Sequence, residues 1–261
     1  MSVAALELGG SHVAAGRVDL EAGTVVRRRV TLPRQASRDE LLERIRTAAG
    51  AAGGAHRLGV AAPGPFDYAT GVSRLRHKLA ALYGVDLRRE LASALGVAPA
   101  AIRFLNDADA FLLGEWLRGA ARGADRVLGV TLGTGLGSAF LADGALAPGV
   151  ELYRSTFRGR PVEETISARG IGGRVSVAKL AVRARRGDER ACDSLERAGG
   201  DLGEFLVPHV RRLRAERVVV GGSIARAWDL FGPVLRARVP EAVRAANLDD
   251  AALVGAAYYA S

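Results

Sequence analysis

The stretch RVLGVTLGTGLGSAFLADG, residues 126–144, decides the expected fold. An apolar run at 126–132 predicts a buried strand, and 138–143 predicts a second strand that ends in an Asp143-Gly144 turn. Between them, Gly133-Thr134-Gly135-Leu136-Gly137 combines three glycines with a hydroxyl residue, which a plain turn does not need. Because glycines let backbone N–H groups approach anionic oxygens, this loop predicts a phosphate clamp, with an ordinary turn as the alternative.

The beginning of the chain repeats this pattern. Residues 2–8 and 12–20 predict two strands joined by Gly9-Gly10-Ser11, and 24–32 predicts a third. An ordinary hairpin turn would use the same three residues, so this loop alone is weaker evidence for phosphate binding. The repeat indicates that one architecture occurs twice in the chain.

The remaining segments predict helices and further strands. A helix begins after Ser37, with Glu40 completing a capping-box pattern, and stops near residues 50–54. The other expected elements are strands at 58–62, 101–105 and 217–220, helices at 86–95, 108–118, 175–214 and 249–259, and a helix opening at Gly221-Gly222-Ser223. Together they predict an α/β protein of two lobes, 1–122 and 123–261, with the last helix packing back on the first lobe.

Composition excludes several classes of protein. The chain has 261 residues, 49% hydrophobic and 25% charged, which excludes a disordered or collagen-like chain. A single cysteine, Cys192, excludes an intramolecular disulfide and a four-cysteine zinc site, and it fits a reducing compartment. Without a basic leader or a long apolar run, the sequence predicts a cytoplasmic protein that has no membrane partner.

The basic charge does not predict a nucleic-acid partner. The formal net charge is +9, and 35 of the 37 basic residues are arginine, with only Lys78 and Lys179 as lysines. The arginine clusters are interrupted by acids and lack interleaved aromatics, so we interpret them as solvated faces. A positive field would still attract phosphorylated or anionic substrates.

Asn106-Asp107 marks the point where an apolar strand gives way to a helix. A carboxylate there projects at the carboxyl end of a sheet, where α/β proteins place their sites. Asp107 would serve equally well as a helix N-cap, since Asp and Asn are preferred capping residues. Together with the two glycine loops, the position favours catalysis.

Five motifs in this order resemble the ROK family of sugar kinases. They are Glu7-Leu8-Gly9-Gly10-Ser11, Ala62-Pro63-Gly64-Pro65, Asn106-Asp107-Ala108-Asp109-Ala110, Leu132-Gly133-Thr134-Gly135-Leu136-Gly137 and Gly221-Gly222. The resemblance covers almost the whole chain, and parts of it look most like the zinc-free polyphosphate and ATP glucokinases. It implies an actin-like, ribonuclease H-like fold of two lobes with the active site in the cleft between them.

The resemblance also implies roles for individual residues. Asp107 becomes the general base that accepts the proton of a sugar hydroxyl as the terminal phosphoryl group of ATP is transferred. The implied substrate-binding residues are Asn106, Gly64, Glu151 and Glu163, with the register between Glu163 and Glu164 open and surface glutamates as the alternative. The implied phosphate- and nucleoside-binding residues are Gly9, Gly10, Ser11, Gly133, Thr134, Gly135, Gly221 and Gly222, with Mg²⁺ positioned near Glu7.

Four residues depart from the family pattern. Glu7 stands where the family usually has an aspartate, and Ser11 where it usually has threonine, so metal placement is the feature in doubt. Arg154 replaces a histidine that is a zinc ligand and sugar contact, and no structural zinc is expected. Lys78 stands near the place of a sugar-binding asparagine. The two cations predict an acceptor with an anionic group or a sugar-like molecule other than glucose, unless both side chains point to solvent.

Two alternatives to an ATP-dependent sugar kinase remain at this stage. One is a catalytically weak or inactive sugar-binding sensor, which the substitutions at Glu7 and Ser11 would favour. The other is a polyphosphate-dependent glucokinase, which the zinc-free resemblance and the basic surface would favour. The family resemblance also implies a homodimer.

Overall fold

The computed structural model describes residues 2–23, 25–33, 35–53, 56–76, 78–239 and 241–261. The chain divides into two compact units. Unit 1 comprises the chain up to Arg118 together with Leu248–Ser261, and unit 2 comprises Gly119–Asn247. The boundary predicted near residue 122 falls at 118/119 in the structure, and the last segment, whose helix was predicted to pack back on the first lobe, belongs to unit 1.

Unit 1 is built on a five-stranded mixed sheet in the order β3-β2-β1-β4-β7. Neighbours β1, β2 and β3 are antiparallel, whereas β4 and β7 continue the sheet in parallel with β1. The strands of the unit are β1 (Ser2–Leu8), β2 (His12–Asp19), β3 (Val25–Thr31), β4 (Leu58–Ala62), β5 (Phe66–Asp67), β6 (Val72–Ser73) and β7 (Ile102–Asn106). Its helices are α1 (Arg38–Ala51), η1 (Ala80–Leu82), α2 (Leu87–Leu95), η2 (Pro99–Ala101), α3 (Asp107–Arg118) and α8 (Ala251–Ala260).

The helix boundaries of unit 1 follow the expected caps. Ser37 Oγ accepts a hydrogen bond from the Glu40 N–H at 3.2 Å and begins α1, as predicted. The reciprocal half of the capping box is not formed, because the Glu40 carboxylate pairs with Arg44 instead. The predicted glycine stop falls partly on Gly54, and the predicted third strand begins at Thr24; both residues lie outside the described ranges.

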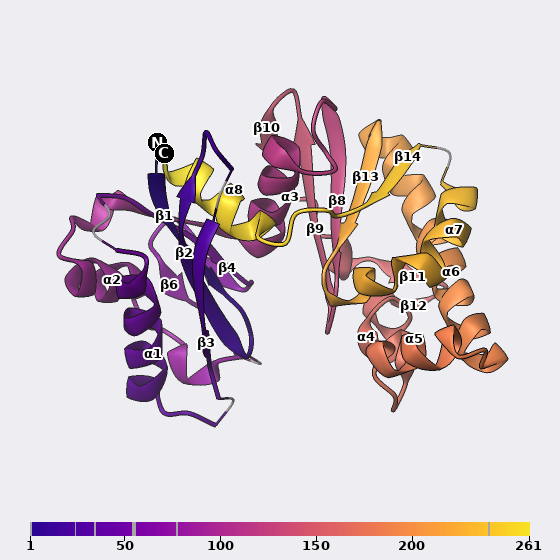
Figure 1. Ribbon diagram of the computed structural model, residues 1–261, viewed down its shortest axis with the longest axis horizontal. Helices are drawn as coiled ribbons and strands as arrows, with labels where there is room; N and C mark the ends of the chain where they lie inside the picture. The colour runs from indigo at the N-terminus through magenta and orange to yellow at the C-terminus, as the bar shows by residue number, and fades with distance from the viewer. Residues whose placement is uncertain (1, 24, 34, 54–55, 77, 240) are drawn as a thin grey trace. The chain divides into compact units, whose positions relative to one another are not determined.

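Helix α8 packs against α3, β1 and β4 (Figure 1). At the glycines of this contact almost no side chain separates the backbones. A Cβ on Gly114 of α3 would lie 1.9 Å from the Ala251 carbonyl oxygen, and one on Gly59 of β4 would lie 1.9 Å from that of Ala256. Real Cβ atoms essentially never approach so closely, so only glycine permits this crossing. The end of the chain thereby fixes α3, the helix that Asp107 begins.

Unit 2 contains a second five-stranded sheet of the same design, in the order β10-β9-β8-β13-β14. Its first three strands are antiparallel, and β13 and β14 continue in parallel with β8. The strands are β8 (Arg126–Leu132), β9 (Leu136–Ala142), β10 (Ala145–Ala147), β11 (Thr156–Phe157), β12 (Arg160–Pro161), β13 (Arg217–Gly221) and β14 (Ala242–Ala245). The helices are η3 (Leu152–Arg154), η4 (Val162–Glu164), α4 (Ala168–Gly172), α5 (Val177–Arg185), α6 (Glu189–Leu213), η5 (Ser223–Ala227) and α7 (Trp228–Arg238).

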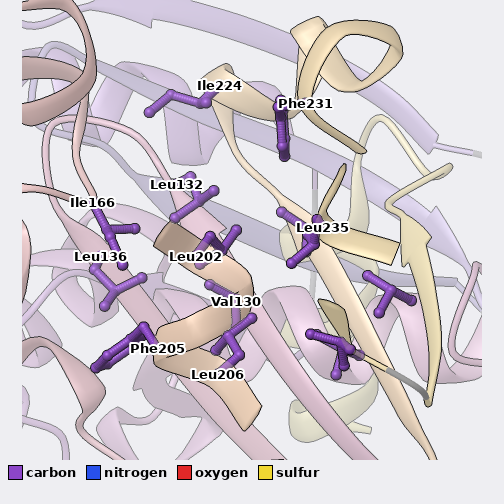
Figure 2. Close-up of a cluster of buried hydrophobic side chains, with 14 of the residues drawn as sticks. Val130, Leu132, Leu136, Ile166, Leu202, Phe205, Leu206, Ile224, Phe231 and Leu235 are labelled. Carbon is purple, nitrogen blue, oxygen red and sulfur yellow. The ribbon is translucent and has the colours of Figure 1, made fainter. Parts of the chain in front are cut away.

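The core of unit 2 forms where α6 and α7 cover one face of its sheet. Figure 2 shows Leu202, Phe205 and Leu206 of α6 facing Val130 and Leu132 of β8, with residues of η5 and α7 completing the cluster. The small hairpin of β11 and β12 is tied to α6 by Arg158, whose guanidinium lies 2.9 Å from a carboxylate oxygen of the buried Asp201. Burial of the apolar cluster between the helices and the sheet supplies the main driving force for the folding of unit 2.

Several sequence-based boundaries were wrong. Strand β9 already begins at Leu136, so the second glycine loop is three residues, Gly133 to Gly135, rather than five. The long helical pattern at 175–214 is two helices, which separate near Gly187. The short strands β5, β6, β10, β11, β12 and β14 were not predicted.

Among the described residues, no helix is both long and apolar enough to span a membrane.

The close crossing of α8 and α3 gives a stability prediction. Gly114→Ala forces the two backbones apart, and we expect it to lower the free energy of unfolding by about 3 kcal/mol, at the upper end of overpacking costs. Gly50→Ala is the matched control, because a Cβ on this glycine of α1 meets nothing within 4 Å. The control should be neutral or stabilising by up to about 1 kcal/mol. Urea unfolding followed by circular dichroism measures both, and equal stability of the two variants would contradict the glycine crossing.

Candidate functional site

The hairpin between β1 and β2 presents unpaired backbone donors. The Gly9 N–H closes the turn by donating to the His12 carbonyl at 2.8 Å. Within the described residues, the N–H groups of Gly10 and Ser11 donate to no protein acceptor. Adjacent unpaired N–H groups in a tight turn form an anion-binding concavity, so this hairpin can receive phosphate oxygens.

Neither glycine of this hairpin has a positive φ, and a side chain at either position would press on a neighbouring side chain. A Cβ on Gly9 would lie 3.0 Å from Cε1 of the His12 ring, and one on Gly10 would lie 2.9 Å from Cδ of Lys78. The His12 ring in turn contacts Arg29, whose guanidinium nitrogen lies 2.6 Å from Nε2. Burial and the Arg29 charge lower the pKa of His12, so the imidazole is neutral and its Nε2 accepts the bond.

Asn106 ends β7, and Asp107 is the first residue of α3. Oxygens of both side chains accept a hydrogen bond from the Ala108 N–H at 2.9 Å, so Asn106, which precedes the helix, is the residue in the capping position, whereas Asp107 accepts only from its immediate neighbour. The Asn106 amide nitrogen donates to the Tyr68 hydroxyl at 2.9 Å. A Cβ on Gly64 would lie 4.0 Å from that amide nitrogen, so the structure brings Gly64 and Asn106 together.

Three carboxyl groups interact near the start of α3. Burial raises the pKa of Asp107, while the Ala108 N–H and the charge of Lys78 oppose that rise. Burial, followed by the charge of Asp107, raises the pKa of Glu7 on β1, against the lowering effect of Arg29 and Arg27. The same two causes raise the pKa of Asp109 to about 6. This mutual repulsion means that a cation bound among these groups would be stabilised.

These carboxylates fit a magnesium ion held jointly with a substrate. Among the described residues, no cluster of three or more His, Cys, Asp and Glu side chains could hold a metal ion by itself. Mg²⁺ in phosphoryl-transfer sites is usually held by one or two carboxylates together with phosphates and waters. Glu7 and Asp107 meet that requirement, since burial and repulsion disfavour their shared negative charge.

The second hairpin, Gly133 to Gly135, joins β8 and β9 in unit 2. The Gly133 N–H donates to the Gly135 carbonyl at 3.0 Å, and the N–H groups of Thr134 and Gly135 have no protein acceptor among the described residues. Oε1 of Glu163 accepts from the Leu136 N–H at 2.7 Å, and a Cβ on Gly135 would lie 2.4 Å from the same oxygen. Glu163 therefore contacts the hairpin directly and stabilises it through this hydrogen bond.

Gly221 and Gly222 lie beside this second hairpin. Strand β13 pairs with β8 so that Gly221 stands opposite Thr131. Gly222 has a φ of +86°, and a Cβ there would lie 2.3 Å from the Leu132 carbonyl oxygen. Glycine is thus required at 222 for both its backbone angle and the close approach.

Glu151 and Arg154 pair with each other. The Arg154 Nε lies 3.0 Å from Oε2 of Glu151, and it also donates to the Tyr153 hydroxyl at 3.0 Å. Both side chains are exposed. Arg154 is therefore paired with Glu151, so it gives no reason to expect an anionic acceptor.

The structure groups the predicted residues within each unit. In unit 1 it gathers Glu7, Gly9, Gly10, Lys78, Asn106, Asp107 and Gly64, and in unit 2 it gathers Gly133, Thr134, Gly135, Glu163, Gly221 and Gly222. Sequence reasoning missed Asp109, His12, Arg29 and Tyr68. The position of Asp109 in the first turn of α3, two residues after Asp107, was the signal that would have identified it.

Two sheets of one topology, each with a glycine hairpin at the same place, define the actin-like α/β class with two lobes. The chain belongs to the ROK family, whose model matches residues 3–152. It is 26% identical to a glucokinase of Thermotoga maritima, over 97% of this chain and 95% of the relative. It is 28% identical to a polyphosphate glucokinase of Mycobacterium tuberculosis, over 97% of this chain and 88% of the relative.

A solved structure agrees with these sequence relatives. The inorganic polyphosphate/ATP-glucomannokinase of an Arthrobacter species superposes with a TM-score of 0.78 at 28% identity, over 99% of this chain and 98% of that one. The predictions of ROK membership and of an actin-like α/β fold are therefore confirmed.

The support of the second hairpin by Glu163 gives a prediction about ligand binding. Glu163→Ala leaves the Leu136 N–H unpaired, which costs about 1–3 kcal/mol, and it frees the loop. We expect the dissociation constant for a nonhydrolysable ATP analogue to rise about tenfold. Glu164→Ala is the matched control, since the neighbouring Glu164 is exposed. Isothermal titration calorimetry measures both, and an equal effect of the two substitutions would rule out the supporting role.

Asp109 gives a prediction about pH and stability. Because its pKa is raised to about 6, the folded state binds the proton more tightly than the unfolded state, so this group's stabilisation is lost as pH rises through about 6. Asp109→Asn mimics the protonated form. We expect the variant to be more stable than the original protein at pH 7.5, by about 2 kcal/mol, and to lose that advantage near pH 4. Thermal unfolding across this range tests it, and an Asn variant that is less stable at pH 7.5 would refute it.

Proposed function

We propose that the protein transfers the terminal phosphoryl group of ATP to a hydroxyl group of a hexose or sugar-like acceptor. Membership of the ROK family supports a sugar kinase, and the relatives named above are glucokinases and a glucomannokinase. The observation that carries the proposal is Asp107, a partly buried carboxylate at the end of β7 that acts electrostatically on Glu7 beside a hairpin with unpaired N–H groups. A base and a phosphate cradle in one unit are what phosphoryl transfer needs.

In this mechanism Asp107 is the general base. Its carboxylate accepts the proton of the acceptor hydroxyl while the hydroxyl oxygen forms its bond to phosphorus. The hydrogen bond from the Ala108 N–H orients the carboxylate. Asn106, held by Tyr68, and Gly64 are the proposed contacts of a neighbouring sugar hydroxyl. Glu151 is a further proposed sugar contact, and the Glu151–Arg154 pair would open to provide it.

The two hairpins are the proposed phosphate ligands. The unpaired N–H groups of Gly10, Ser11, Thr134 and Gly135 stabilise charge on phosphate oxygens, and Gly221 and Gly222 are proposed to contact the nucleoside. Glu7 is the residue that would hold Mg²⁺, directly or through water, and the ion would neutralise phosphate charge.

The donor has two candidates. The Mycobacterium tuberculosis relative is named for polyphosphate, and the Arthrobacter enzyme is named for both inorganic polyphosphate and ATP. Polyphosphate therefore remains the second candidate donor for this chain, with the same base and the same hairpins.

Three further expectations stay predictions. The anionic acceptor now depends on Lys78 alone, since Arg154 is paired with Glu151. The homodimer and the cytoplasmic location follow only from the family resemblance and from composition. The sensor alternative predicts ligand binding without turnover, which the next experiment detects.

Asp107→Asn tests the proposed function. We expect turnover to fall by a factor of about a thousand or more, which corresponds to roughly 4 kcal/mol of barrier, because the amide cannot accept the proton. Turnover is measured with Mg²⁺ and either ATP or polyphosphate across hexoses, amino sugars, acidic sugars and cyclitols. Asp39→Asn, an exposed position on α1, is the control and should retain full activity.

The pH dependence follows from the same carboxylate. Since the pKa of Asp107 is raised by burial, kcat/KM should fall as the pH is lowered through a value above the ordinary range of an aspartate. Activity that persists in Asp107→Asn would show that another group is the base. Ligand binding without turnover by the unmodified protein would support the sensor alternative.

A further inference from the structure

Lys78 is a cation at the first hairpin that the protein itself does not neutralise. It is one of two lysines in a chain whose other 35 basic side chains are arginines. Its side chain is exposed, and among the described residues it forms no hydrogen bond and no ion pair. A cation left without a protein partner, beside partly buried carboxylates, is available to a ligand.

The residues that follow Lys78 are anchored in the core of unit 1. Leu79, the next residue, has a φ of +51°, which is unusual for a leucine, and its side chain is buried. Leu82 of η1 is fully buried as well. Such strain persists only where the surrounding structure requires it, so the buried Leu79 anchors the chain directly after Lys78.

From that point the stem of Lys78 crosses the first hairpin. A Cβ on Gly10 would lie 2.9 Å from Cδ of Lys78 and 3.4 Å from its Cγ. Gly10 has no positive φ, so an L-residue could adopt its backbone angle. An alanine at 10 would therefore push directly against the lysine stem and shift it.

The charge of Lys78 lies close enough to affect Asp107. It lowers the pKa of that carboxyl group, although no ion pair forms between them. The same side chain lies over Gly10, which has one of the two unpaired N–H groups of the hairpin. The ammonium group is thus near both the phosphate donors and the base.

We propose that the Lys78 ammonium group binds the phosphoryl group that is being transferred, rather than the sugar. The inference rests on the proposed function. As the acceptor oxygen forms its bond to phosphorus, its proton passes to Asp107, and the bond from phosphorus to the bridging oxygen breaks, with the electron pair leaving on the donor. Lys78 keeps its proton throughout and stabilises negative charge on the phosphoryl oxygens.

Lysine suits this role better than arginine. An ammonium group is a compact point charge on a flexible stem, whereas a guanidinium is a planar fork that needs space for two parallel bonds. Over Gly10 the available space admits a slim methylene chain. Lys78→Arg should therefore restore only part of the function of Lys78.

The two lysines allow a direct test that needs no turnover. Reductive methylation with ¹³C-formaldehyde labels Lys78, Lys179 and the chain's amino terminus, and Lys179→Arg assigns the lysine signals. We expect tripolyphosphate, or a nonhydrolysable ATP analogue with Mg²⁺, to shift the Lys78 resonance without any acceptor and to leave the Lys179 resonance unmoved. A Lys78 resonance that responds to acidic sugars but not to phosphates would overturn the proposal in favour of an anionic acceptor.

Kinetics with matched variants complete the test. Lys78→Met keeps the stem and removes the charge, and we expect kcat to fall about a hundredfold while the KM for the acceptor is unchanged. Lys179→Met, on α5 of unit 2, is the control and should behave like the original protein. Unchanged kcat in a folded Lys78→Met protein would refute the role of Lys78 and leave the proposed kinase standing. Absence of turnover in every protein, with the Lys78 resonance still shifted by phosphate, would refute the kinase instead.

A double-mutant cycle connects Lys78 to Gly10. Gly10→Ala displaces the lysine stem, so it should lower kcat in the original protein and have little further effect in Lys78→Ala. Equal losses in both backgrounds would mean that Gly10 acts without the lysine, which would overturn this part of the proposal.

Discussion

Unit 1 depends on three glycines that let main chains touch. A Cβ on Gly59, Gly114 or Gly255 would lie 1.9 Å from a carbonyl oxygen of the neighbouring segment. Because no side chain separates these backbones, α8 fixes α3 and β4 within a narrow range of positions. Asp107 begins α3, so the position of this carboxylate is set by the last helix of the chain. Glu115 of α3 adds to this, since its buried carboxylate accepts the Leu248 N–H at 3.0 Å as the chain re-enters unit 1.

The hairpin glycines obey a different constraint. Gly10 and Gly135 have no positive φ, so ordinary turns would accept other residues there. A charged side chain from a distant segment lies against each of them, Lys78 at Gly10 and Glu163 at Gly135. The carboxylate at Gly135 satisfies a loop N–H, whereas the ammonium at Gly10 is left open to a ligand. The two hairpins thus share a sequence pattern while their surroundings differ in charge.

Most of the fold could be predicted from short-range hydrophobic patterns in the sequence. Strands β1, β4 and β8 were predicted at their observed bounds, because burial on both faces leaves continuous apolar runs. Edge strands such as β10 and β14 have only a few residues and no such run. Motifs likewise identified the glycine hairpins and Asp107. The contacts of Lys78 and Glu163 could not be read from the sequence, since each joins segments far apart in the chain and depends on how the units fold.

The basic side chains of unit 1 differ in whether a protein group already pairs with them. Glu7, Asp107 and Asp109 repel one another and would also repel an approaching phosphate. Arg27 is paired with Asp250, and Arg29 is in contact with His12, so neither guanidinium is free to follow a substrate. Lys78 forms no ion pair among the described residues, so its charge remains available to a phosphate. Because burial and repulsion disfavour negative charge on Glu7 and Asp107, a cation bound beside these two carboxylates would lower the electrostatic cost of bringing a phosphate close to them.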